Sequence, residues 1–178
     1  MINRSAIDRL DRAGDRMLEP LRTHALTAAL FGAASTVGDF SIVWHVIGLL
    51  RSVGSVDRLR EALFLSTALG AESLIVNQGV KRMFGRERPT ASGDERFGIR
   101  TPSTSSFPSG HASSATFAAV ILVHFTGMPA GLLFVALAVI VSLSRAVVRI
   151  HHLSDIIGGI AVGAGLGLAA VWLAGSLL

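Results

Sequence analysis

Long apolar runs alternate with short charged segments along the chain. The six apolar runs are Leu21–Val37, Phe40–Leu50, Ala62–Val80, His111–Phe125, Gly131–Val148 and Ile156–Leu178. A helix needs about 20 mostly apolar residues to cross a hydrocarbon core about 30 Å thick, and the last four runs approach or reach that length. The pattern therefore predicts an all-α, polytopic bundle of transmembrane helices.

The first two runs leave the number of spans open. Each is short for a membrane span, and Gly38-Asp39 interrupts the apolar sequence between them. They form either two short spans, which gives about six spans in total, or one long and broken span, which gives five. We favour six, because a Gly-Asp pair suits a membrane boundary.

The composition agrees with a membrane protein. Of the 178 residues, 51% are hydrophobic, and the mean hydropathy is +0.58. That is more apolar than a soluble domain of this size can bury. At this length we expect a single membrane-embedded domain, residues 1–178. The absence of cysteine excludes disulfides, a thiolate nucleophile and a Cys-ligated metal.

Residues 1–20 form a polar leader. Its segment Ser5–Leu18 places Ile7, Leu10, Met17 and Leu18 near one helical face, with most Asp and Arg residues elsewhere. This spacing predicts an amphipathic helix on the membrane surface, the alternative being a partly ordered polar leader. Because its first twenty residues alternate Arg and Asp and lack an apolar core, the leader is not a signal peptide.

The basic residues indicate membrane topology more than nucleic-acid binding. A nucleic-acid site would need a basic patch with interleaved aromatic residues, and the chain has none. With six spans, the leader and the Arg51–Arg60 loop share one side, which the positive-inside rule makes cytoplasmic. The Lys81–Phe107 loop and the Arg145–Asp155 turn then face outward. That loop is itself basic, through Lys81, Arg82, Arg86, Arg88, Arg96 and Arg100. We attribute the conflict to anion binding, and expect an outward-facing site in a bacterial cell membrane.

The first polar cluster runs from Lys81 to Pro89 at the end of an apolar run. Lys81 is the only lysine among the sixteen Lys and Arg residues. The position therefore favours a compact ammonium group over a planar guanidinium. The alternative is a juxtamembrane anchor.

The second cluster, Ser105–His111, runs directly into an apolar helix. Serine suits the N-cap and proline the first turn. The backbone N–H groups of Ser109, Gly110 and His111 would then point out of the helix N-terminus and could bind phosphate. Simple capping with an interfacial histidine is the alternative.

The third cluster, Ser144–Asp155, contains two histidines and a carboxylate. If the segment is helical, Asp155 lies four residues after His151 on the same face and could hold one imidazole nitrogen. His152, three residues before Asp155, is the competing candidate. Alternatively, Asp155 only complements a helix N-terminus.

The three clusters together contain the parts that phosphoryl transfer requires: fixed cations, a nucleophile and an acid. The chain resembles the type 2 phosphatidic acid phosphatase (PAP2) family, membrane lipid phosphatases related to vanadium haloperoxidases. The family pattern is K-x6-R-P, P-S-G-H and S-R-x5-H-x3-D. It is matched in order by Lys81 to Arg88-Pro89, by Pro108 to His111, and by Ser144-Arg145 through His151 to Asp155, all within residues 81–155.

The resemblance implies a role for each matching residue. The phosphate-binding groups would be Lys81, Arg88, Ser109, Gly110 and Arg145. His151 would attack phosphorus and form a phosphohistidine, Asp155 would orient it, and His111 would protonate the leaving oxygen. The family spacing selects His151 over His152. One departure is Leu153, where family members often have proline.

We therefore expect a lipid phosphate phosphatase that needs neither metal nor cofactor and binds a lipid substrate within the bilayer. Phosphatidic acid, phosphatidylglycerophosphate and polyprenyl phosphates all fit, as does a decaprenyl-linked phosphoribose phosphate if the source is actinobacterial. The alternative is an anion-binding transporter or channel that does not hydrolyse. Since His151 must be neutral and His111 protonated, the pH–rate profile should be bell-shaped. The oligomeric state stays open.

Overall fold

The computed structural model describes residues 4–89, 97 and 103–178, so Arg96 and Arg100 of the basic loop lie outside the described residues. Every regular element within them is helical. The α-helices are α1 (Arg4–Thr23), α2 (Ala25–Val37), α3 (Ile42–Ser52), α4 (Val56–Leu74), α5 (Gly110–Thr126), α6 (Leu132–Val147) and α7 (Leu153–Leu177). The prediction of an all-helical polytopic bundle is confirmed.

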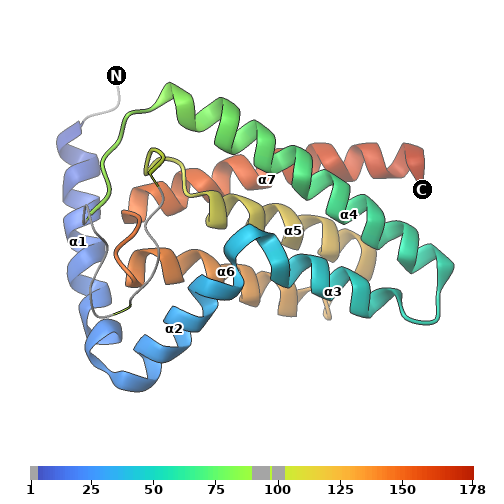
Figure 1. Ribbon diagram of the computed structural model, residues 1–178, viewed down its shortest axis with the longest axis horizontal. Helices are drawn as coiled ribbons and strands as arrows, with labels where there is room; N and C mark the ends of the chain where they lie inside the picture. The colour runs from blue at the N-terminus through green and yellow to red at the C-terminus, as the bar shows by residue number, and fades with distance from the viewer. Residues whose placement is uncertain (1–3, 90–96, 98–102) are drawn as a thin grey trace.

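Helix α5 lies at the centre of the bundle and packs against α4, α6 and α7 (Figure 1). Its contact with α7 depends on glycines spaced four residues apart. A Cβ atom at Gly163 would lie 2.2 Å from the carbonyl oxygen of Ser113, whereas one at Gly165 would meet nothing within 4 Å. Small residues on one face let two helices approach closely in lipid. This close contact sets the N-termini of α5 and α7 side by side.

Helices α2 and α3 correct the preference for six spans. A short 3₁₀ turn, Asp39–Ser41, separates them and bends their axes by 66°. Phe40 and Ser41 adopt positive φ angles of 53° and 59°. In Figure 1, α3 continues away from α1 and does not return toward it, so the pair runs once along the bundle. The Gly-Asp break bends the chain without reversing it, which matches the five-span alternative.

Helix α1 crosses one end of the bundle at a steep angle to the other helices (Figure 1). It is a regular helix, so the alternative of a partly ordered leader is wrong for residues 4–23. Arg22 is buried and donates hydrogen bonds to the carbonyl oxygens of Val147 at 2.9 Å and Ala146 at 3.0 Å. A cation at these carbonyls stabilises the C-terminal end of α6. Part of the polar face of α1 therefore meets protein.

The same arrangement corrects the expected position of the leader relative to the third cluster. The six-span interpretation placed the leader on the side opposite the third cluster. In the structure α1 contacts the end of α6 and the start of α7, so the leader and the third cluster lie at one end of the bundle.

The outer surface of the bundle is apolar, but the helices differ in length. Within the described residues α7 alone, with 25 residues and a mean hydropathy of 2.1, is long and apolar enough to cross a membrane, and the bent α2–α3 pair would be a second span. Helix α6 is apolar but has 16 residues. Large side chains such as Leu133 and Trp172 are exposed on the outside. An exposed apolar surface of this kind suits lipid contact.

Candidate active site

Lys81 lies at the site because the helical winding changes after α4. After α4 the chain forms a π-helical turn, Ile75–Gly79, and a 3₁₀ turn, Val80–Met83. Insertions of this kind are frequent at functional sites. Lys81 is buried, and its Nζ would lie 3.4 Å from a Cβ placed on Gly110. The ammonium group therefore faces the N-terminus of α5, so the first two clusters meet.

The N-terminus of α5 has a serine cap, as predicted, but not the expected proline. The hydroxyl oxygen of Ser109 accepts from the Ala112 N–H at 3.4 Å, while Pro108 lies before the cap rather than in the first turn. The Ser109 N–H donates to the carbonyl oxygen of Asp155 at 3.0 Å. It is therefore engaged in tying α5 to α7. The N–H groups of Gly110 and His111 begin the helix, where no intrahelical acceptor exists.

The middle of the third cluster, residues 148–152, is a turn between two helices. The premise that the segment around His151 is helical is therefore wrong. Helix α6 ends at Val147 and α7 begins at Leu153, with Arg149 at a positive φ of 57° between them. The expected pair still forms, because the turn brings His151 Nδ1 to 3.6 Å from Asp155 Oδ2.

Two contacts define the tautomer of His151. Arg88 Nη1 lies 3.2 Å from His151 Nε2. A guanidinium can only donate, so Nε2 accepts and the ring proton is on Nδ1, facing Asp155. The lone pair of Nε2 therefore points toward a cation that phosphate could bind. The geometry selects His151 as the nucleophile candidate.

Asp155 is fully buried and hydrogen-bonded on both carboxylate oxygens. Oδ2 accepts from the Ser106 hydroxyl at 2.5 Å and from the His152 N–H at 2.9 Å. Oδ1 accepts from Arg86 Nη1 at 2.6 Å. Asp155 thus both complements the start of α7 and faces His151, so the two readings of this residue are compatible.

His111 lies on a different support. Its Nε2 is 3.0 Å from Oδ1 of Asp39, in the strained turn between α2 and α3. Both residues line a pocket of about 480 Å³ together with Lys81 and Gly110. His111 therefore faces open space where a leaving group could lie.

Three cations converge on this region: Lys81 and Arg145 are buried, and Arg88 is half-buried. Arg145 is 1% exposed and hydrogen-bonds to Ser35, yet its Nε has no hydrogen-bond partner among the described residues. Burial, followed by the positive charges of Arg88 and Arg145, lowers the pKa of Lys81 to about 8. An anion placed among them would relieve this repulsion.

Burial also determines the protonation state of the nucleophile candidate, His151. It lowers the pKa of His151 to about 3, and although Asp155 opposes this shift, Arg88 and Arg145 reinforce it. The imidazole is therefore neutral at physiological pH, as an attacking nitrogen must be. Among the described residues, no group of three or more His, Asp or Glu side chains could hold a metal ion.

The sequence interpretation missed several residues at the site. Arg86 and Ser106 stand inside the recognised clusters but received no role, and Asp39 was read only as a break. Glu72 is buried in α4 and accepts a hydrogen bond from Ser113. An ionisable residue inside a predicted span was the signal that could have identified Glu72. Asp11 carried no comparable signal.

The chain is similar to known proteins over most of its length. Residues 61–177 match the model of the PAP2 superfamily. The decaprenylphosphoryl-5-phosphoribose phosphatase of Mycobacterium tuberculosis (strain H37Rv) is 36% identical over 134 residues, 75% of this chain and 72% of the relative. The protein of the same name from Mycolicibacterium smegmatis is 35% identical over 130 residues, 71% of this chain and 68% of the relative.

A solved structure supports the fold. A transmembrane PAP2-type phosphatidylglycerolphosphate phosphatase from Bacillus subtilis superposes with a TM-score of 0.73 and 21% identity. The match covers 99% of this chain and 90% of the other. The two proteins thus share one helical fold.

Proposed function

Because the chain belongs to the PAP2 superfamily and is a lipid phosphate phosphatase, we propose that Lys81, Arg88 and Arg145 bind the phosphate that His151 attacks. The observation that carries this proposal is the convergence of the buried Lys81 and Arg145 and the half-buried Arg88 on the region of the His151 Nε2 lone pair. The N–H groups of Gly110 and His111 add donors from the helix N-terminus. Ser109 supports them through its cap.

The reaction would proceed in two displacements. Nε2 of His151 attacks phosphorus as the bond to the lipid-borne oxygen breaks, and His111 protonates that oxygen, so that a phosphohistidine and an alcohol result. Water, deprotonated by His111, then attacks the phosphohistidine. Inorganic phosphate leaves, and His151 regains its lone pair. The fixed cations stabilise the equatorial oxygens in both steps.

For the substrate, we propose a polyprenyl-linked sugar phosphate of the decaprenylphosphoryl-5-phosphoribose phosphate type. Two relatives carry that activity in their names. The pocket beside His111 supports the same choice, because polar side chains including His45, Ser73 and Asn77 line it. Such groups suit a leaving alcohol that carries hydroxyls better than one made of two acyl chains.

The test is phosphate release from a panel of lipid phosphates in detergent with excess chelator. We expect activity to survive the chelator, vanadate to inhibit, and the sugar phosphate lipid to be preferred over phosphatidic acid. Loss of activity with chelator would instead indicate a metal-dependent reaction. Anion flux in vesicles without phosphate release would support the transporter alternative.

We further propose that the site faces the cytoplasm, which reverses the expectation drawn from six spans. Among the described Lys and Arg residues, those at the far end of the bundle are Arg51, Arg58 and Arg60, and the others lie at the end that carries α1 and the site. The positive-inside rule assigns the basic end to the cytoplasm.

The chain has no cysteine, so single-cysteine labelling can test this orientation. Val53→Cys and Gly85→Cys place exposed thiols at opposite ends of the bundle. An impermeant maleimide added to intact cells should label Val53→Cys and reach Gly85→Cys only after permeabilisation. The reverse pattern would place the site outside.

A further inference from the structure

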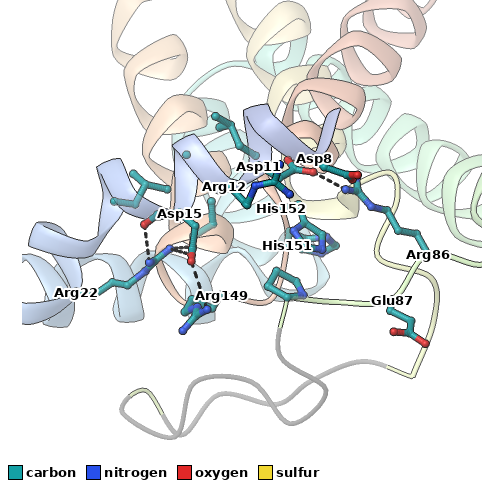
Figure 2. Close-up of a pocket in the computed structure, with 15 residues that line it drawn as sticks. Asp8, Asp11, Arg12, Asp15, Arg22, Arg86, Glu87, Arg149, His151 and His152 are labelled. Atoms are coloured by element: carbon teal, nitrogen blue, oxygen red, sulfur yellow. Dashed lines mark hydrogen bonds and ion pairs between the residues drawn. The ribbon is translucent and has the colours of Figure 1, made fainter. Parts of the chain in front are cut away.

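Helix α1 places a buried carboxylate beside the support of the nucleophile. Figure 2 shows α1 across a pocket that contains His151, with Asp11 joined to Arg86. The pocket has a volume of about 520 Å³. Asp11 is 8% exposed, although the leader reads as a solvated segment. Because a buried carboxylate is costly unless it is paired, the partners of Asp11 explain its position.

Arg86 links α1 to Asp155 through two different nitrogen atoms. Its Nη1 donates to Asp155 Oδ1 at 2.6 Å and to the Ser154 hydroxyl at 2.7 Å, and its Nη2 donates to Asp11 Oδ2 at 2.5 Å. Ser154 closes the network, since its N–H donates to Asp11 Oδ1 at 2.9 Å and its hydroxyl to Oδ2 at 3.0 Å. A rigid guanidinium fork can hold two carboxylates in this way, whereas an ammonium cannot.

Asp155 can orient His151 only if its own carboxylate is fixed. Oδ2 faces His151 Nδ1 and also accepts from Ser106 and from the His152 N–H. Oδ1 is held by Arg86. The terminal torsion of an aspartate is intrinsically broad, so without Arg86 the carboxylate could rotate and the imidazole would follow. A misplacement of about 1 Å at a reacting group can cost about 100-fold in rate.

We propose that Arg86 and Asp11 are positioning residues that hold the Asp155–His151 pair in its attacking geometry. Helix α1 thereby contributes a residue to the active site. The inference rests on the proposed role of His151 as nucleophile. The Arg86 guanidinium donates to Asp11, Ser154 and Asp155, so it acts on the groups that hold the nucleophile.

The contact between α1 and α7 supports this assignment. A Cβ at Gly14 would lie 2.8 Å from Cδ2 of Leu153, so α1 rests closely on the first residue of α7. Leu153 is the residue that departs from the proline common in the family. Here it meets α1 one turn after Asp11, and holds the helix over the site.

The experiment separates binding of phosphate from attack by His151. In Arg86→Gln and Asp11→Asn, kcat for the preferred lipid phosphate should fall about 10- to 100-fold, with KM changed by less than about twofold. The Ki of inorganic phosphate should not change, because Lys81, Arg88 and Arg145 are intact. The Ki of vanadate should rise by about the factor that kcat/KM falls, because vanadate resembles the transition state only when His151 bonds to it.

Matched variants control for charge and shape. Arg82→Gln and Asp8→Asn change exposed residues of the same two segments and should leave both Ki values unchanged. Arg86→Lys should recover part of the lost kcat, because an ammonium can reach one carboxylate. The double variant Arg86→Gln/Asp11→Asn should be no slower than Arg86→Gln, because the two residues act as one unit.

Two results would overturn the inference: a wild-type kcat in Arg86→Gln, or a parallel rise in the Ki of phosphate and of vanadate. If Arg86→Gln does not fold in detergent, the nearly isosteric Asp11→Asn tests the inference instead. The same two constants are measured, the Ki of phosphate and the Ki of vanadate. Failure of the proposed function itself would appear in the wild-type protein, as absent phosphate release, or as activity that survives His151→Ala.

Discussion

The two histidines of the site are held in opposite ways. His151 is 3% exposed and lies between Arg88, Ser106 and Asp155, all in turns or at helix ends tied to the core. The side chain of His111 is 17% exposed, borders a pocket and lies beside Asp39 in a strained turn. A nucleophile must keep one direction of attack, whereas an acid must reach first a leaving oxygen and then a water. The difference in support fits that division of labour.

Removal of the rigid histidine should have the largest effect. In His151→Ala, phosphate release should fall by at least about 10⁴-fold, because no other group can take the phosphoryl. The loss should be equal for the lipid substrate and for p-nitrophenyl phosphate, since both need the nucleophile. Measured initial rates and the loss of acid-labile phosphoenzyme check this.

His152→Ala is the matched control for that prediction. The group that holds Asp155 is the backbone N–H of His152, which survives the substitution. This variant should keep most of its activity, and an inactive His152→Ala beside an active His151→Ala would exchange the two assignments.

Removal of the pocket-facing histidine, His111, should have a smaller effect that depends on the leaving group. His111→Asn should slow hydrolysis of the lipid substrate by about 10²- to 10⁴-fold, the usual contribution of a general acid. With p-nitrophenyl phosphate the loss in kcat/KM should be much smaller, because kcat/KM reports the first displacement and nitrophenolate leaves without protonation. Equal losses for both substrates would contradict the acid role and place His111 in binding.

The contrast also explains how much could be predicted from the sequence. The three clusters stand out because each is short and local, and the family resemblance assigned roles to Arg88, His151 and Asp155 without knowledge of the tertiary fold. The contact between Asp11 and Arg86 joins residues 75 positions apart, and no local pattern encodes it. Asp39 was likewise hidden, since a Gly-Asp pair in an apolar run reads equally well as a boundary.

The number of membrane spans was hard to predict for a related reason. Apolar periodicity shows where a helix is interrupted but not the direction in which the chain continues. At residues 39–41 the chain bends by 66° and goes on, which the positive φ angles of Phe40 and Ser41 accommodate. Sequence reasoning thus located the helices and grouped residues that the structure brings together, but not the end of the bundle to which α1 belongs.

The pH dependence should separate the cations from the nucleophile. With the pKa of His151 lowered to about 3 by burial, its neutral form persists far below the usual histidine range, so His151 should cause no acid limb near pH 6.5. The pKa of Lys81 is lowered to about 8, so its charge is present below that pH and is lost above it. The loss of this charge should therefore lower the logarithm of kcat/KM further above about pH 8, beyond the fall that deprotonation of the acid His111 causes.

Lys81→Arg tests the origin of that basic limb. A guanidinium does not lose its proton in this range, so the variant should be slower at neutral pH but should lack the limb near pH 8. An unchanged limb in Lys81→Arg would assign it to another group. An inflection near pH 6 would belong to the phosphomonoester, whose second ionisation occurs at about that pH.

The smallest expected effect concerns the support of His111. Asp39→Asn keeps the shape of the turn but removes the carboxylate that lies 3.0 Å from Nε2, so kcat for the lipid substrate should fall by about 3- to 10-fold. Asp57→Asn, an exposed carboxylate at the other end of the bundle, is the control and should have no effect. Since Asp39 acts through His111, the loss should vanish in kcat/KM for p-nitrophenyl phosphate, and with either substrate in a His111→Asn background. A loss that persists in both would mean that Asp39 shapes the pocket. The orientation of His111 would then not depend on Asp39.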